Sequence, residues 1–364
     1  MVELLTPEIT IAGRRIGSGQ PAYIIAEMSA NHHGDYDEAV RLVKAAKEAG
    51  ADAIKLQTYT ADTLTIKSDL AHFRIQGNTL WDGRTLYDLY KEAYTPWEWQ
   101  PRLKRVADQV GLHLFSSPFD TTAVDFLETM QVPVYKIASF EIVDIALLQR
   151  VAKTKKPVIV STGMATLAEI EEAVSTLRHA GATQIALMKC TSAYPANPED
   201  SHLNTMRHLA EAFEVPVGLS DHTMGPHVPI GAAALGMSLL EKHFVMDRKH
   251  PGPDSAFSME PAEFKDMVQG VRTLEKARGS VHYGINAEEE KSRIFRRSLF
   301  VVEDIKAGDV FTAKNIRSIR PGYGLHTRFL PQVLGRHAAT DLARGTPLAW
   351  SHMSGEKERT PTHA

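Results

Sequence analysis

Short apolar runs, rich in β-branched and aromatic residues, recur along the first three quarters of the chain. Each run is about as long as a strand that is buried on both faces. The runs lie at 23–29, 53–59, 112–118, 134–139, 157–162, 184–190, 216–221 and 238–244. We therefore predict eight buried strands.

Segments with helical periodicity separate these runs, and several of them end at a glycine. Examples are 37–50, 99–111, 167–181 and 263–279. Eight strand and helix units over about 260 residues have the size and rhythm of a (β/α)₈ TIM barrel. A doubly wound sheet is the alternative, but no glycine-rich phosphate-binding fingerprint follows any of the runs.

The pattern changes after the predicted eighth helix. We predict a barrel domain with an N-terminal hairpin at 1–285 and a charged linker at 286–297. Short β-runs broken by Gly and Pro then predict a small β-rich domain at 298–352, with a flexible tail at 353–364. A core of that size is marginal alone, so we expect the small domain to pack on another surface.

Composition narrows the function classes. The 364 residues include 41 Lys+Arg and 44 Asp+Glu, a balance that gives no electrostatic case for nucleic acid or an anionic membrane. The single cysteine, Cys190, rules out an internal disulfide framework. The first residues lack the charged and apolar pattern of a signal peptide, so we expect none, and no apolar run is long enough to span a bilayer. We expect a soluble cytoplasmic protein.

Polar residues end every predicted strand, at the rim where barrel active sites lie. The lysines Lys55 and Lys136 suit an anion with several oxygens, such as a phosphate plus a carboxylate. The hydroxyls expected to help them belong to Ser117, Ser139, Ser161 and Ser220. On the eighth strand, Lys242 is expected at the rim together with His243.

His222 and His243 end neighbouring strands, where they could share Mn²⁺, Zn²⁺, Fe²⁺ or Co²⁺ as a Lewis acid. Glu27 and Glu141 are candidates for acid–base work or for holding sugar hydroxyls, and Asp254 lies in a loop over the same rim. The long loop at about 60–96 is predicted to be a lid or an interface element.

These parts favour a metal-assisted enzyme that forms carbon–carbon bonds from a phosphorylated carboxylate. A Schiff-base aldolase remains an alternative, with Lys55, Lys136 or Lys189 as its nucleophile. A metal hydrolase is a second alternative, although no third or fourth protein ligand is apparent.

Several motifs, in order, resemble the sialic acid synthase family and most closely its bacterial pseudaminic acid synthase branch. They include "IIAEMSANHHGDYDEAV", "YKIASFE", "STGMAT", "CTSAYPA", "GLSDHT", "EKHF" and "PGPDSAFSMEP". The segment "RRSLFVVEDIKAGDVFTAKNIRSIRPGYGL" is similar to the antifreeze-like (SAF) domain of that family. The resemblance covers about residues 8 to 350.

The resemblance implies a role for each matching position. Phosphoenolpyruvate is expected at Lys55, Ser117, Lys136, Ser139, Ser161, Ser192 and Ser220, and the amino sugar at Glu141, Tyr194, Asp254 and Arg320. His222 and His243 are the implied ligands of a divalent metal, Mn²⁺ or alternatively Mg²⁺ or Co²⁺. Glu27, His222 and Lys55 form the implied catalytic set. Arg320 is expected to reach the other subunit's sugar site in a domain-swapped homodimer.

The implied reaction joins phosphoenolpyruvate to 2,4-diacetamido-2,4,6-trideoxy-L-altrose, giving pseudaminate and phosphate. N-acetylneuraminate or legionaminate synthesis, with the same chemistry on another sugar, is the alternative. Ser192 stands where sialic acid synthases carry an asparagine, which favours the pseudaminic branch. The antifreeze-like domain also raises a non-enzymatic carbohydrate-binding function, but that function would not need two lysines and two histidines on one rim.

Overall fold

Eight parallel strands close into a barrel in the computed structural model, which describes residues 7–77 and 79–355. They are β3 Tyr23–Glu27, β4 Ala53–Thr58, β5 His113–Pro118, β6 Tyr135–Ile137, β7 Val158–Ser161, β8 Ile185–Cys190, β9 Val217–Asp221 and β10 Leu239–His243. The strands neighbour one another in chain order, and β10 pairs with β3 to close the barrel. The predicted barrel is confirmed.

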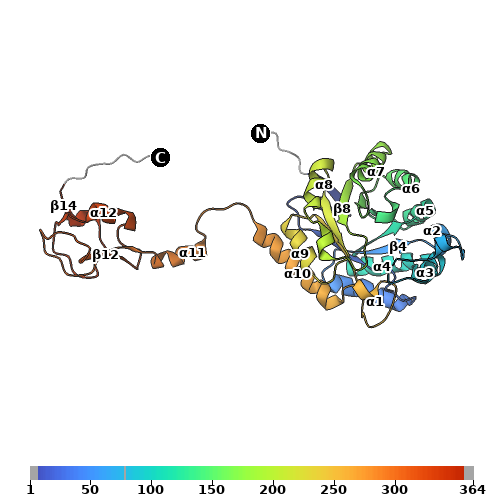
Figure 1. The fold of residues 1–364 in the computed structure, drawn as a ribbon, viewed down its shortest axis with the longest axis horizontal. Helices are drawn as coiled ribbons and strands as arrows, with labels where there is room; N and C mark the ends of the chain where they lie inside the picture. The colour runs from blue at the N-terminus through green and yellow to red at the C-terminus, as the bar shows by residue number, and fades with distance from the viewer. Residues whose placement is uncertain (1–6, 78, 356–364) are drawn as a thin grey trace. The chain divides into compact units, whose positions relative to one another are not determined.

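Helices surround the strands on the outside of the barrel (Figure 1). The main ones are α1 Tyr36–Glu48, α4 Gln100–Val110, α5 Thr121–Thr129, α6 Ile145–Ala152, α7 Leu167–His179, α8 Thr205–Phe213, α9 His227–Ala234 and α10 Pro261–Arg278. Helix α1 begins after Asp35, whose carboxylate accepts from the backbone N–H groups of Asp37 and Glu38. Helix α4 ends at Gly111, which has a left-handed φ of 66°.

The strands are buried on both faces, so their outward apolar side chains pack against the helices and form one large core. A hairpin of β1 Glu8–Ile11 and β2 Arg14–Gly17 precedes the barrel. Its Ile9, Ile11 and Ile16 are buried in the same core. The hairpin is therefore part of the barrel unit.

Loops at the carboxyl ends of the strands carry short helices. The long β4–α4 connection contains α2 Ala61–Leu64, η1 Ala71–Phe73, α3 Leu86–Ala93 and η2 Trp97–Trp99. Further 3₁₀ turns are η3 Ser139–Glu141 after β6, η4 Pro198–Ser201 after β8 and η5 Ser255–Phe257 after β10. The Trp81 indole of the long connection donates to the Pro253 carbonyl at 2.9 Å. This contact ties the long connection to the loop after β10.

The chain divides into two compact units, 1–279 and 280–364. The second unit contains α11 Ala287–Ser292, β11 Ser298–Val301, β12 Ile316–Ile319, α12 Leu330–Val333, β13 His337–Ala338 and β14 Met353–Ser354. It has its own small apolar core around Leu299, Phe311 and Ile316. β14 pairs with β13 although it lies in the predicted tail, and the part of the tail after residue 355 lies outside the described residues.

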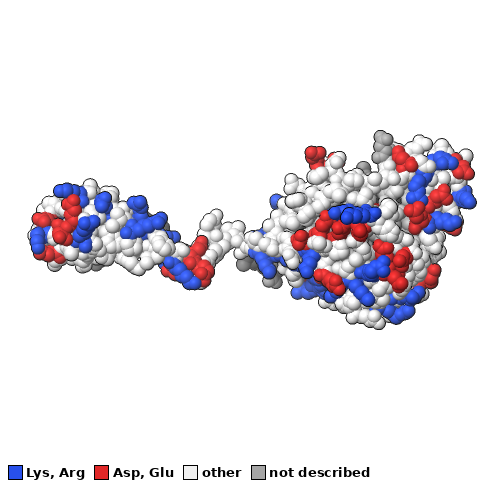
Figure 2. Space-filling model, turned by 90° about the horizontal axis from the view of Figure 1, so that it is seen from below, with Lys and Arg blue, Asp and Glu red and all other residues white. Residues whose placement is uncertain are grey.

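Charges of both signs alternate over the face of each unit drawn in Figure 2. This agrees with the formal net charge of −3. Within the described ranges, no helix is long and apolar enough to cross a membrane.

Candidate active site

Charged side chains enter the barrel near the carboxyl ends of its strands. Side chains alternate along a strand, so Glu241 and His243 of β10 face one side and Lys242 faces the other. The register sets His243 beside Glu27 and Glu27 beside Lys55. All five side chains are buried. The inward-facing Glu27, Lys55 and Glu241, together with Lys136, form a buried ionic cluster, called the ionic floor below.

Two carboxylates balance two ammonium groups in this floor. Glu27 Oε2 lies 2.6 Å from Lys55 Nζ. Glu241 Oε1 lies 3.1 Å from Lys136 Nζ and 3.7 Å from Lys55 Nζ. Buried charges are costly unless they are paired. The pairing therefore offsets the cost of burying these charged side chains close together.

The two carboxylates differ in their protonation. Burial raises the pKa of Glu27 to about 7, even though Lys55 opposes the shift. Burial also acts on Glu241, but the charges of Lys136 and Lys55 outweigh it and lower the Glu241 pKa. Glu27 can thus exchange a proton near neutral pH, whereas Glu241 stays ionised.

Glu241 was missed by the sequence analysis, and the expectation for Lys242 was wrong. Lys242 donates to the Asp221 carboxylate and to the Thr223 carbonyl, on the outer side of the strands. The signal was present in the strand alternation, because an inward-facing His243 requires that Glu241 also face inward.

The serines expected to bind an anion surround the same floor. Ser117 Oγ accepts from Lys55 Nζ at 3.2 Å, and Ser220 Oγ donates to Glu241 Oε1 at 3.2 Å. Ser161 Oγ is buried without a hydrogen-bond partner. Buried hydroxyls are normally paired, so Ser161 is well suited to a ligand oxygen.

Gly163 brings two more serines together. Its backbone N–H donates to Ser139 Oγ at 3.1 Å. A Cβ at this position would lie 2.6 Å from Ser139 Oγ and 2.2 Å from Ser192 Oγ. A side chain at this position would therefore displace both hydroxyls, which belong to the loops after β6 and β8. Ser192 Oγ also lies 3.8 Å from Cys190 Sγ.

The two predicted metal ligands are adjacent. The rings of His222 and His243 have centroids 5.3 Å apart. His222 Nδ1 donates to the Thr191 carbonyl at 2.9 Å, which leaves Nε2 free as a ligand. His243 Nδ1 is buried without a hydrogen bond, and burial lowers the His243 pKa well below its usual range. A neutral imidazole with an unpaired nitrogen fits a divalent metal.

The expected sugar-binding residues border the histidines. The Tyr194 ring lies 4.4 Å from that of His222 and 5.7 Å from that of Trp81, measured between centroids. Asp254 Oδ2 accepts from Ser29 Oγ and lies 3.9 Å from His243 Nδ1. These contacts place Tyr194 and Asp254 next to the two histidines.

Glu141 and Arg320 are in different surroundings. Glu141 Oε2 is buried without a hydrogen bond, and burial raises the Glu141 pKa to about 7. Arg320 follows β12 in the second unit and is exposed. The barrel unit therefore contains every predicted site residue except Arg320.

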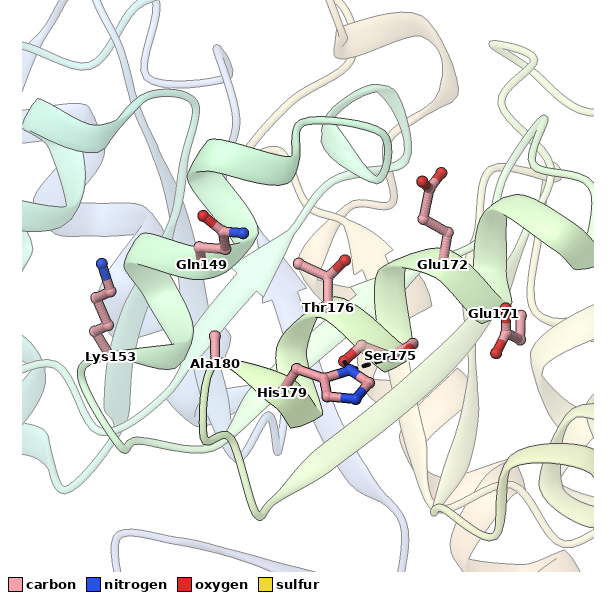
Figure 3. Close-up of a pocket in the computed structure, with 8 residues that line it drawn as sticks. All are labelled: Gln149, Lys153, Glu171, Glu172, Ser175, Thr176, His179 and Ala180. Carbon is pink, nitrogen blue, oxygen red and sulfur yellow. Dashed lines mark hydrogen bonds between the residues drawn. The ribbon is translucent and has the colours of Figure 1, made fainter.

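A hollow of about 570 Å³ lies elsewhere, between α6 and α7 on the outside of the barrel (Figure 3). Its lining includes Lys153, Glu172 and His179. His179 Nδ1 is hydrogen-bonded within its own helix, to Ser175. The hollow is a groove between two helices, and its lining contains none of the buried lysines and glutamates of the rim.

The fold and the rim together define a (β/α)₈-barrel protein with buried lysines and glutamates beside two histidines, followed by a small β domain. The chain belongs to the NeuB family, which matches residues 42–283, and residues 296–353 match the SAF domain.

Relatives and a solved structure agree with this assignment. The pseudaminic acid synthase of Helicobacter pylori is 46% identical over 331 residues, covering 91% of this chain and 97% of the relative. A pseudaminic acid synthase of Campylobacter jejuni is 45% identical over 326 residues, covering 90% and 95%. The structure of N-acetylneuraminic acid synthetase from Leptospira borgpetersenii is 32% identical with a TM-score of 0.70, covering 79% of this chain and 95% of that one. The resemblance indicated by the sequence motifs is confirmed.

Proposed function

We propose that this chain is a pseudaminic acid synthase. It would condense phosphoenolpyruvate with 2,4-diacetamido-2,4,6-trideoxy-L-altrose to give pseudaminate and phosphate. The observation that carries the proposal is the buried floor of Lys55, Lys136 and serine hydroxyls next to the two adjacent imidazoles of His222 and His243. The similarity to pseudaminic acid synthases over about nine tenths of the chain supports the choice of sugar.

Phosphoenolpyruvate would bind on the ionic floor. Lys55 and Lys136 offset its phosphate and carboxylate charges. The hydroxyls that would contact it belong to Ser117, Ser139, Ser161, Ser192 and Ser220. The unpaired Ser161 hydroxyl supports this arrangement, because an anion oxygen would complete it.

His222 and His243 would hold a divalent cation, with Mn²⁺ the first choice and Mg²⁺ or Co²⁺ as alternatives. When bound, this cation supplies Lewis-acid polarisation of the sugar aldehyde. The Thr191 carbonyl orients the His222 ring for that role.

The remaining steps form the carbon–carbon bond, add water and transfer a proton. C3 of phosphoenolpyruvate attacks the aldehyde carbon, water adds at C2, and phosphate leaves with cleavage of the C–O bond. Ionised Glu27 would accept a proton from the added water, which its pKa of about 7 allows. Glu27 also pairs with Lys55, so both act at the reacting end of the site.

The sugar would lie above this floor. Glu141, Tyr194 and Asp254 would contact its hydroxyl and acetamido groups, and the Trp81 indole would help cover the mouth of the barrel. Arg320 would come from the partner subunit in a domain-swapped homodimer.

Exposed apolar side chains on the rim support the homodimer. Five of them, on the segments that follow β6, β7 and β9, are more than half exposed: Phe140, Val143, Met164, Leu167 and Met224. An apolar rim of this kind is typical of an interaction surface. Tyr323, close to Arg320 in the sequence, is also exposed and would pack on such a surface.

We also propose a cytoplasmic location, because phosphoenolpyruvate is made and consumed there.

A Schiff-base aldolase is the second candidate, because burial lowers the pKa of Lys136. The ion pair of Lys136 with Glu241 argues against a neutral amine. Lys55 is a weaker nucleophile still, because Glu241 and Glu27 raise its pKa despite burial. Reduction with borohydride in the presence of substrate would trap a lysine adduct only if this reading were correct.

Release of phosphate from phosphoenolpyruvate tests the proposed function. The assay offers, in parallel with Mn²⁺, the altrose sugar, its manno isomer with the same acetamido groups, and N-acetylmannosamine. We expect release with the altrose sugar alone, and its loss with a chelator. Release with another sugar would move the enzyme to the legionaminate or N-acetylneuraminate reaction. No release with any sugar would refute the proposal.

A further inference from the structure

A second set of metal-ligating side chains lies beside the site, made by His33, Glu38 and His250. Each of the three residues offers one ligand atom, and these atoms all lie within 4.8 Å of one another. No other group of three or more His, Cys, Asp or Glu in the described part of the chain is this close. Glu38 Oε1 is 3.1 Å from His33 Nδ1, and Glu38 Oε2 is 3.7 Å from His250 Nδ1. None of the three belongs to the His222 and His243 pair.

Hydrogen bonds fix the proton on His33. The Asn31 side-chain amide donates to the Phe244 carbonyl at 3.0 Å and to Ser258 Oγ at 2.9 Å, so its Oδ1 is turned toward Ser255. Ser255 Oγ donates to this oxygen at 3.5 Å. The Ser255 hydroxyl oxygen then accepts a hydrogen bond from His33 Nε2, which lies 3.1 Å away. His33 therefore carries its proton on Nε2 and presents a lone pair at Nδ1.

That lone pair faces a carboxylate. His33 Nδ1 is buried and makes no hydrogen bond, although Glu38 Oε1 is only 3.1 Å away. The side chains of His33 and Glu38 are 6% and 7% exposed, so solvent does little to screen the two electron-rich atoms. Such a contact is unfavourable without a cation between the atoms. The neighbouring His250 ring stacks on His33 with centroids 4.0 Å apart and supplies a third donor.

We propose that His33, Glu38 and His250 bind a divalent transition-metal cation, with Zn²⁺ the best match to two imidazole nitrogens and one carboxylate. This donor set is typical of zinc and leaves a position for water. His250 is 55% exposed, so the site is open to the solvent and its cation can exchange.

The location gives the cation a role. His33 and Glu38 follow β3, whereas His250 lies in the loop after β10. A Cβ at Gly252 of that loop would lie 2.7 Å from the His33 ring, so the two segments already touch. The cation would fasten them together and fix Asp254, which is in the same loop and is bonded to Ser29. This last consequence rests on the proposed function, in which Asp254 contacts the sugar.

Zinc content after equilibrium dialysis tests the site without any activity assay. Four full-length proteins are compared: the native chain, His222→Ala with His243→Ala, His250→Ala, and His208→Ala. His208 is an exposed histidine of α8 and serves as the matched control. We expect two zinc ions per chain in the native and control proteins, and one in each of the other two.

The double variant isolates this site from the proposed catalytic metal. With Co²⁺ in place of Zn²⁺, it should show visible d–d absorption that disappears when His250→Ala or Glu38→Gln is added. Circular dichroism checks that each variant is folded. Because His250 is exposed, we expect His250→Ala to fold like the native protein. A folded double variant that binds no zinc would overturn the inference. So would a His250→Ala protein with undiminished zinc content.

The same variants separate this inference from the proposed function. If only the function is wrong, the double variant still binds one zinc. If both hold, His250→Ala raises the KM for the sugar several-fold and leaves the KM for phosphoenolpyruvate unchanged.

Discussion

The Glu241 carboxylate lies 3.1 Å from the Lys136 ammonium at the centre of the barrel mouth. The same oxygen accepts the Ser220 hydroxyl. Glu241 thus engages two groups that are proposed to hold phosphoenolpyruvate: it favours the charged form of Lys136 and holds both side chains in place.

Glu241→Gln should destabilise the free protein. It removes one of two carboxylates that neutralise two buried ammonium groups, and breaking a buried pair in this way costs about 3 kcal/mol. Saturating phosphoenolpyruvate should restore part of the loss, because its charges replace the missing carboxylate. Urea unfolding with and without phosphoenolpyruvate measures both effects. Glu199→Gln, at an exposed glutamate, is the control, and an equal midpoint in the two variants would contradict the role of Glu241.

Lys136→Met should weaken the use of phosphoenolpyruvate. The loss of a charge-assisted contact is worth roughly 1.5–3 kcal/mol, which corresponds to about a 10- to 150-fold fall in kcat/KM for phosphoenolpyruvate. The KM for the sugar should change little, because Lys136 lies in the floor of the site. Lys153→Met, on the outside of the barrel, should behave like the native protein. A variant impaired only toward the sugar would refute the assignment.

Gly163→Ala should impair the same substrate by another route. The new methyl group would overlap Ser139 Oγ and Ser192 Oγ, so both hydroxyls must move. We expect the KM for phosphoenolpyruvate to rise at least several-fold while the protein stays folded. Gly231→Ala is a suitable control, because the nearest atom to its Cβ would be at 3.7 Å. An unchanged KM would show that these serines do not contact phosphoenolpyruvate.

The pH dependence of the rate should report Glu27. Its pKa is raised to about 7, so the ionised form that accepts a proton is depleted as the pH falls below 7. We expect kcat/KM to rise about tenfold per unit toward pH 7 and then to level off. Glu27→Gln should lower the activity and abolish this limb, whereas Glu141→Gln should retain it. A limb that persists in Glu27→Gln would assign the proton transfer to another group.

The sequence predicted the barrel strands and most of the residues at their ends. The spacing of apolar residues and the charged residues within apolar runs carry that information. Lys55, Lys136 and His243 interrupt apolar runs, and a charge in a buried strand must be paired or used. Glu241 and Lys242 are adjacent in the same run, and only the facing of the strand tells them apart. Composition alone does not supply that facing.

The pairing of His33 with Glu38 and His250 was also beyond the sequence. The partners come from segments more than 200 positions apart, and their approach depends on how β10 closes the barrel against β3. All three residues stand in the sequence, but the sequence does not show that Glu38 lies between the two histidines.

The fate of the bridging oxygen of phosphoenolpyruvate tests the central claim most directly. The measurement uses phosphoenolpyruvate labelled with oxygen-18 at the C–O–P bridge, the altrose sugar and Mn²⁺, with mass spectrometry of both products. We predict labelled phosphate together with pseudaminate, because the C–O bond breaks during condensation. Unlabelled phosphate with pyruvate as the other product would mean P–O cleavage by a hydrolase, and it would contradict the account.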